Sequence, residues 1–211
     1  MKIIDQSIEV LNLPDKQKAL ELLEVAGRTC YKSKSTGDPS EFVKRIVDSG
    51  HHSVIEHISA TFKIICDRGV SHELVRHRLC SFSQESTRYA NYSKEKFGNE
   101  ITVIKPFFFD EGCVEYFYWK QAMLRAEEFY LDLIRQGAKP EEARSVLPNS
   151  LKTEIVMTAN LREWIHILDL RLSKRAHPQI REVAMLIQAE FAWWMPEIFN
   201  RWYEKQKTIE E

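Results

Sequence analysis

The sequence predicts an α/β protein of the α+β type, in which helices surround a mixed, mostly antiparallel sheet within a single domain, residues 1–211. Two kinds of segment predict this class. In some, apolar and polar side chains alternate with the period of two that is typical of half-buried strands. Others have apolar residues at helical spacing after a residue that favours a helix start. A chain of 211 residues that is 44% hydrophobic is long enough to bury one substantial core.

The strands are predicted from alternation and the helices from their caps. Between Ile58 and Cys66 every second residue is apolar, and Asn160 precedes an apolar-faced helix. Strands are expected at 2–12, 58–66, 101–104 and 151–159, with a turn at 67–69. Helices are expected at 15–32, 38–50, 71–76 (capped by Ser71), 111–136, from 140, at 161–171 and at 178–194.

Composition limits the class of function. The 30 Lys and Arg residues nearly balance the 31 Asp and Glu residues, so no global positive field favours nucleic acid, and any nucleotide site must be local. The four cysteines form no Cys-x-x-Cys pair, which is typical of reduced thiols in a cytoplasmic protein. No apolar run is long enough for a membrane span or a signal peptide. We therefore expect a soluble, cytoplasmic protein.

The stretch from Arg76 to Tyr89 is the strongest candidate for a binding site. Its basic residues are Arg and His without Lys, and a planar guanidinium can clamp phosphate or paired carbonyl oxygens through two hydrogen bonds. On a helix, Arg76 and Arg78 would point in nearly opposite directions and serve different groups. The residues from Ser86 to Arg88 could surround a phosphate with backbone N–H groups, hydroxyls and a guanidinium. A solvated helix face is the alternative.

A second polar segment, from His51 to His57, resembles a metal-binding helix at first sight. An inverted zinc-protease signature requires His-x-x-Glu-His, but position 53 is Ser. His52 and Glu56 alone supply too few ligands for a catalytic zinc. We therefore expect no metal, and expect these histidines to hydrogen-bond a polar ligand.

Arg76-His77-Arg78, followed by seven residues and Ser86, resembles the signature of the flavin-dependent thymidylate synthases. Further blocks resemble the same family in order, and together they cover about residues 50–93 and 143–181. The resemblance implies reductive methylation of dUMP to dTMP, with 5,10-methylenetetrahydrofolate as carbon donor and NADPH reducing a bound FAD. It also implies a homotetramer whose active sites are shared between subunits.

The resemblance further implies roles for individual residues. Those expected to bind FAD are His51, Ser53, Arg76, His77, Arg78, Gln84, Asn160, Leu161, Arg162 and His166. Those expected to bind dUMP are Glu73, Arg76, Gln84, Glu85, Ser86, Thr87, Arg88, Arg144 and Arg171, in part through the backbone of 84–88. Two positions depart from the family pattern: His166 stands where an amide is expected, and Gln84 where a carboxylate also occurs in similar sequences.

Elementary chemistry suggests how such an enzyme would work. Carbon C5 of uracil must become nucleophilic, and a guanidinium beside the N3 and carbonyl edge would stabilise the charge that develops on the ring. Arg171 is the candidate catalytic residue. The reducing hydride must come from a cofactor, because no side chain supplies one. A covalent route, with Cys80 or Ser86 attacking C6, is the alternative within this class.

Two other classes of function compete with this one. In a nucleic-acid-binding module, the basic stretch would bind phosphates while Phe82, Tyr89 and Tyr92 stack on bases. In a metal hydrolase, His51, His52, Glu56 and His57 would hold the ion. Neither class explains the second polar block, from Asn160 to Arg171.

Overall fold

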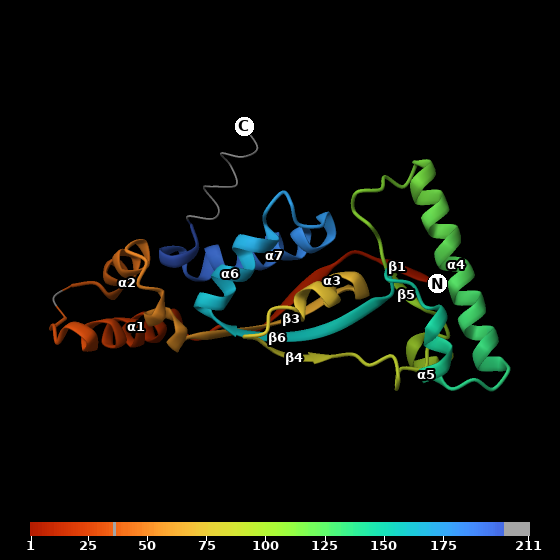
Figure 1. Ribbon diagram of the computed structural model, residues 1–211, viewed down its shortest axis with the longest axis horizontal. Coiled ribbons are helices and arrows are strands. Elements are labelled where there is room, and N and C mark those ends of the chain that lie inside the picture. The colour runs from red at the N-terminus through yellow and green to blue at the C-terminus, as the bar shows by residue number, and fades with distance from the viewer. Residues whose placement is uncertain (36, 201–211) are drawn as a thin grey trace. The chain divides into compact units, whose positions relative to one another are not determined.

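The computed structural model describes residues 1–35 and 37–200 (Figure 1). The strands are β1 (Lys2–Ile4), β2 (Ser7–Asn12), β3 (Ser59–Asp67), β4 (Ser81–Gln84), β5 (Thr102–Ile104) and β6 (Lys152–Asn160). The α-helices are α1 (Lys16–Tyr31), α2 (Pro39–Asp48), α3 (Arg68–Leu74), α4 (Val114–Arg135), α5 (Pro140–Ala143), α6 (Leu161–Arg171) and α7 (Pro178–Trp194). Three 3-10 helices complete the set: η1 (His52–His57), η2 (Glu95–Phe97) and η3 (Arg144–Val146).

The predicted α/β class is confirmed. Four strands form a sheet in the order β2-β3-β6-β4, and β1 pairs with β5 in a separate parallel ribbon. The long strands β3 and β6 are antiparallel, because the Leu161 amide donates to Ile58 whereas the Arg68 amide, further along β3, donates to Leu151. Both strands alternate buried and partly exposed side chains, as their sequence pattern predicts. No helix in the described part of the chain is long and apolar enough to cross a membrane.

The segment around the Arg-His-Arg motif differs from its prediction. Residues 67–69 were expected to turn, but α3 begins at Arg68 because the Asp67 carboxylate caps it, accepting from the Val70 amide at 2.6 Å. Ser71 is therefore no cap; it lies buried inside the helix. The helix ends at Leu74, before the motif. Arg76 and Arg78 therefore do not lie on a helix, and the expectation that a helix points them in opposite directions does not apply. Strand β4, which follows the motif, was not predicted.

Two compact units make up the chain. Unit 1 comprises residues 1–7, 64–76 and 83–155. In it, α4 packs one face on a core that includes Met123 and Tyr130, and the N-terminal ammonium pairs with Glu100 and Glu127. The ring of buried Tyr92 packs against Tyr130, and its hydroxyl donates a hydrogen bond to the Glu85 carboxylate. These contacts fix the chain that follows β4.

Unit 2 comprises residues 8–63, 77–82 and 156 onward. Its core is aromatic: the rings of Phe62, Trp164 and Phe191 pack against one another with centroids 5.2–5.5 Å apart. Helices α1 and α2 lie side by side (Figure 1), and Gly27 permits their close approach, because a Cβ there would stand 2.6 Å from Ile46 Cδ1. The single domain expected for residues 1–211 stays a prediction.

Candidate active-site residues

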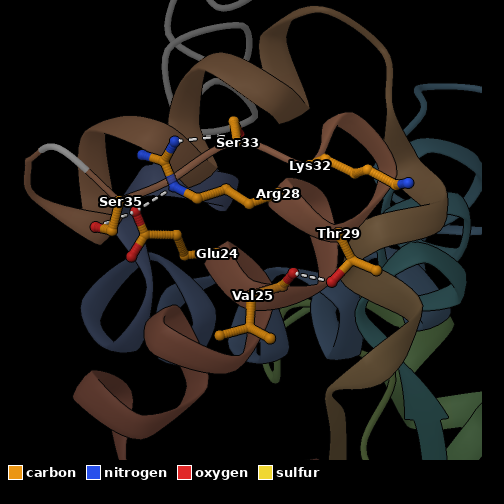
Figure 2. Close-up of a pocket in the computed structure, with 7 residues that line it drawn as sticks. All are labelled: Glu24, Val25, Arg28, Thr29, Lys32, Ser33 and Ser35. Carbon is orange, nitrogen blue, oxygen red and sulfur yellow. Dashed lines mark hydrogen bonds and ion pairs between the residues drawn. The ribbon is translucent and has the colours of Figure 1, made fainter.

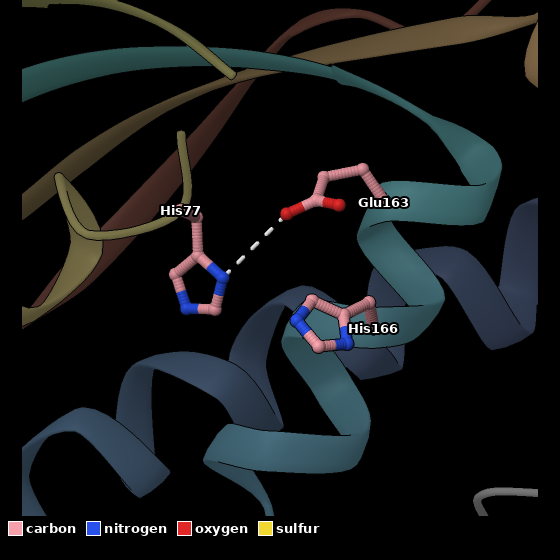
Figure 3. A group of neighbouring side chains, drawn as sticks. All are labelled: His77, Glu163 and His166. Carbon is pink, nitrogen blue, oxygen red and sulfur yellow. Dashed lines mark ion pairs between the residues drawn. The ribbon is translucent and has the colours of Figure 1, made fainter. Parts of the chain in front are cut away.

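The middle residue of the Arg-His-Arg motif is buried beside helix α6. His77 is 4% exposed, whereas Arg76 and Arg78 on either side are exposed. Glu163, in the first turn of α6, and His166, one turn later, face His77 (Figure 3). The His77 Nδ1 atom lies 3.6 Å from the Glu163 carboxylate, and the two imidazole centroids are 5.9 Å apart at 76°. The buried His77 thus meets two polar residues of a distant helix, of which Glu163 is buried and His166 is exposed.

A hydrogen bond connects this group to the candidate catalytic arginine. Arg171 Nε donates to His77 Nε2 at 3.0 Å, although 94 positions separate them. Because an arginine N–H can only donate, His77 Nε2 must be the accepting lone pair, which leaves the ring proton on Nδ1, facing Glu163. Burial, and then the charge of Arg171 and the nearby His166, lower the pKa of His77 to about 4. His77 is therefore neutral near pH 7.

The pKa of Glu163, the carboxyl group of this cluster, is also shifted from its ordinary value. Burial raises the pKa of Glu163, and the nearby His166 opposes that rise. Asn160 caps α6 by accepting from the Glu163 amide at 2.9 Å, and a position in the first turn favours a negative charge. The cap therefore fixes where the Glu163 side chain leaves the helix.

His77, Glu163 and His166 form the group within residues 1–35 and 37–200 whose ligand atoms, all within 4.8 Å, could hold a metal. The hydrogen bond from Arg171 opposes that use. A metal on His77 Nδ1 would place the ring proton on Nε2, so that two N–H groups would face each other. The segment from His51 to His57, which suggested a metal hydrolase, supplies no such group among the described residues.

Three of the expected flavin ligands line one hollow in unit 2. The hollow has a volume of about 330 Å³, and His51, Ser53 and Arg162 line it together with α1 residues Gly27 and Cys30. An imidazole, a hydroxyl and a guanidinium are suitable donors for the phosphates and hydroxyls of a dinucleotide. Arg162 also pairs with Glu56 at 2.5 Å, which holds its side chain at the rim of α6. The donor set fits part of an FAD molecule.

The remaining flavin candidates divide by exposure. Arg76, Arg78 and His166 are exposed and can reach a ligand. The Asn160 oxygen is occupied by capping α6, so its amide nitrogen is the group that can donate. Leu161 is fully buried, and its side chain belongs to the core.

The expected nucleotide residues of unit 1 surround the loop that follows β4. Gln84 donates from its amide nitrogen to the hydroxyls of Ser71 and Thr153, so its carbonyl oxygen is the atom left to meet a ligand. Glu85 accepts from Lys152 at 3.1 Å and from the Tyr92 hydroxyl, which directs its carboxylate into the unit. Glu73 lies half-buried near the end of α3.

The centre of this loop is suited to bind an anion. Arg144 donates to the buried Thr87 hydroxyl at 3.3 Å, and Arg88 lies 3.8 Å from Glu141. The Ser86 hydroxyl accepts from the Arg88 amide at 3.3 Å. Within the described residues, the backbone N–H groups of Ser86 and Thr87 donate to no protein acceptor. Two N–H groups and two exposed guanidinium groups are the features that bind phosphate.

Two alternatives lose support in this geometry. Burial, with the Glu163 charge, raises the pKa of the Cys80 thiol to about 12, so Cys80 is not the thiolate that covalent attack requires. Tyr92 is buried and packs on Phe97 and Tyr130, so its ring cannot stack on a base as the nucleic-acid module requires.

A further hollow, of about 490 Å³, lies between the end of α1 and the segment after it (Figure 2). Its polar groups bond to one another: Glu24 accepts from Arg28 at 2.7 Å and from Ser35 at 2.9 Å. The hollow contains none of the expected site residues. Because Glu24, Arg28 and Ser35 bond to one another, few of its polar groups are available to bind a substrate.

Glu163 is the site residue that the sequence did not single out. A glutamate three residues after a capping Asn is the ordinary pattern of a helix start, so its spacing signals only a cap. The signal that could have found it is its position three residues before His166, which places both on one helix face.

Comparison with known proteins agrees with the sequence motif. The family model described as "Thymidylate synthase complementing protein" matches residues 12–197. The chain is 40% identical over 199 residues to the flavin-dependent thymidylate synthase of Thermococcus kodakarensis, covering 90% of this chain and 80% of that protein. It is 39% identical over 163 residues to the Pyrococcus furiosus enzyme of the same name, covering 77% of this chain and 66% of that protein. The chain belongs to the flavin-dependent thymidylate synthase family.

Solved structures share the fold. A UMP/dUMP methylase, PolB, from Streptomyces cacaoi, crystallised with 5-Br dUMP, superposes with a TM-score of 0.76 at 24% identity. The match covers 95% of this chain and 96% of that one. The same protein with 5-Br UMP gives a TM-score of 0.75 at 23% identity.

Proposed function

We propose that this chain catalyses the reductive methylation of dUMP to dTMP, with 5,10-methylenetetrahydrofolate as carbon donor and FAD that NADPH reduces. The observation that carries the proposal is the hydrogen bond from Arg171 to the neutral His77, within a chain whose residues 12–197 match the family. It brings the candidate catalytic guanidinium to the centre of the family's signature motif.

FAD, when bound and reduced by NADPH, would supply the hydride that no side chain can provide. His51, Ser53 and Arg162 would hold it, since they line one hollow with a matching donor set. Arg76, His77, Arg78, Gln84, Asn160, Leu161 and His166 complete the expected set. His77 would act there mainly through Arg171, because its buried ring already has a hydrogen bond from that residue.

The nucleotide phosphate would lie at the loop after β4. The N–H groups of Ser86 and Thr87 and the guanidinium groups of Arg88 and Arg144 would neutralise it. Glu73, Arg76, Gln84 and Glu85 are the other proposed nucleotide contacts. The phosphate contacts position the substrate without taking part in the bond changes at the ring.

Arg171 would act on the uracil ring. Its guanidinium, fixed through Nε on His77, would donate to the N3 and carbonyl edge of the ring, where negative charge develops as C5 becomes nucleophilic, before C5 attacks the one-carbon unit. An arginine suits this role because it stays charged at any working pH. The raised pKa of Cys80 supports a route without a thiolate nucleophile.

The assembly and location follow from the same proposal. We expect a homotetramer with shared active sites, in the cytoplasm, whose partners are small-molecule substrates and neither nucleic acid nor membrane. The matched region spans 66% of the Pyrococcus furiosus relative, which contains further residues outside it.

A visible absorption titration tests the proposal. The purified chain should take up FAD and show a flavin spectrum that dUMP then perturbs, whereas thymidine without phosphate should perturb it less. A chain that takes up no FAD would overturn the proposal. Binding of oligonucleotides with a steep salt dependence would favour the nucleic-acid module.

A further inference from the structure

The side chain of Arg171 donates to His77, and His77 in turn contacts Glu163. His77 Nε2 accepts the Arg171 Nε–H at 3.0 Å, and the other ring nitrogen of His77 faces the Glu163 carboxylate at 3.6 Å. Glu163 and His77 are 7% and 4% exposed, so water does not compete strongly for either group. The three side chains form a line from carboxylate to imidazole to guanidinium.

This line sets the tautomer of His77. An imidazole can present a lone pair on Nε2 only if its proton is on Nδ1, and a carboxylate near Nδ1 favours that tautomer. The opposite tautomer would turn an N–H toward Arg171 and a lone pair toward Glu163, so both contacts would become unfavourable. Glu163 thus favours the tautomer in which His77 can accept from Arg171.

We propose that Glu163 is a positioning residue for the methylation reaction: through the tautomer of His77 it fixes the orientation of the Arg171 guanidinium that would meet the substrate. The inference rests on the proposed function for its effect on turnover, but its structural part does not. Two further groups face the line. His166 lies one turn along α6 from Glu163, and Cys80 is close enough for the Glu163 charge to affect it. Neither residue has a carboxyl group, so Glu163 is the carboxylate of the group.

Helix α6 fixes the spacing between Glu163 and Arg171, because it carries both residues. Glu163 lies in the first turn of α6 and Arg171 is its last residue, and the apolar side of this helix is buried in the aromatic core of unit 2 through Trp164 and Leu168. The cap at Asn160 fixes the first turn, so the carboxylate has little freedom. A rigid helix that carries both the arginine and the group that orients its partner preserves their spacing.

The test uses the Arg171 Nε–H as a direct probe. In full-length protein labelled with ¹⁵N-arginine, the Nε–H signal that disappears in Arg171→Lys should be protected from solvent exchange. In Glu163→Gln, which keeps the shape but removes the charge, its exchange should quicken about tenfold. In the same variant, kcat should fall about 10-fold to 100-fold while KM for dUMP changes less than twofold, as is typical of lost orientation of a reactive group. Glu128→Gln, on the exposed side of α4, is the matched control and should change neither.

Two substitutions of His77 separate orientation from folding. His77→Gln can keep an acceptor near the Nε2 position, whereas His77→Asn reaches only the Nδ1 position. His77→Gln should therefore retain more Nε–H protection and a higher kcat than His77→Asn at equal thermal stability. Unchanged protection in Glu163→Gln, or equal loss in the two His77 variants, would overturn the inference. If the wild-type protein forms no dTMP, the proposed function fails, and the exchange measurement still decides the positioning role.

Discussion

The two sets of candidate residues are built in opposite ways. In unit 2, His77 and Glu163 are buried, and a continuous line of polar contacts ends at Arg171. In unit 1, Arg88 and Arg144 are exposed, and their contacts are long, at 3.8 and 3.3 Å. The first set is held by contacts among its own buried groups, whereas the second set offers exposed guanidinium groups and backbone N–H groups.

This difference matches two tasks. Stabilising charge on a reacting ring requires a donor at a fixed place, because the stabilisation depends on geometry that is set in advance. Holding a phosphate depends mainly on charge and on several donors, each of which contributes modestly. Substitutions in unit 2 should therefore affect kcat, and those in unit 1 should affect KM.

The largest effect is expected for Arg171→Ala. Removing the donor to the developing charge should lower kcat by about 10²-fold to 10³-fold while the protein still binds FAD. Steady-state dTMP formation and the flavin spectrum measure the two quantities. Unchanged turnover would remove Arg171 from the mechanism and abolish the contrast between the two units.

The buried imidazole should also make the stability of the protein pH-dependent. Because the pKa of His77 is about 4 in the folded protein and near 6.5 when unfolded, the unfolded chain takes up a proton first as the pH falls. Its contribution to the free energy of unfolding should fall by about 2 kcal/mol between pH 7 and pH 5. His77→Gln should lose this contribution in denaturant titrations at the two pH values. The same loss in His77→Gln as in the wild type would show that His77 is not the buried group responsible.

Arg144→Ala should have a smaller effect, confined to binding. Loss of one charge-assisted contact to the phosphate should raise KM for dUMP about tenfold with kcat nearly unchanged. Arg125→Ala, which removes an exposed arginine of α4, is the control. A fall in kcat as large as that of Arg171→Ala would mean that the two units do not divide the work in this way.

The smallest effect is expected for Cys80→Ala. The pKa of this thiol is raised to about 12 by burial, so little thiolate exists near neutral pH, and activity should remain within about twofold. Initial rates of dTMP formation measure it. Loss of activity, together with a covalent adduct to the nucleotide in mass spectrometry, would favour the covalent route instead.

Local signals in the sequence predicted most of the fold. Alternation located β3 and β6, and caps or helix-starting prolines located α2, α6 and α7. The prediction failed at a short polar segment that fits both a turn and a helix start. The sequence suggests a turn at Asp67, but the Asp67 carboxylate caps α3. Strand β4 has only four residues, and its pairing with β6 depends on a partner about 70 positions away, which no local pattern encodes.

The sequence suggested candidate residues for the site, which stay a prediction, but it did not predict the contacts among them. The family motif suggested His77 and a separate downstream block suggested Arg171, but the hydrogen bond between these residues spans 94 positions and depends on how the segment before β4 and helix α6 fold. Glu163 was missed because a helix cap explains it fully at the level of sequence. His77 is buried whereas its arginine neighbours are exposed. The sequence does not show this difference, because burial arises only when the chain folds.

The most direct test of the account is an omission series for dTMP formation by the purified chain. The complete mixture of dUMP, 5,10-methylenetetrahydrofolate, NADPH and FAD should yield dTMP, and omission of FAD from the cofactor-free protein should abolish it. Formation of dTMP without FAD, or none in the complete mixture when FAD is bound, would contradict the central claim.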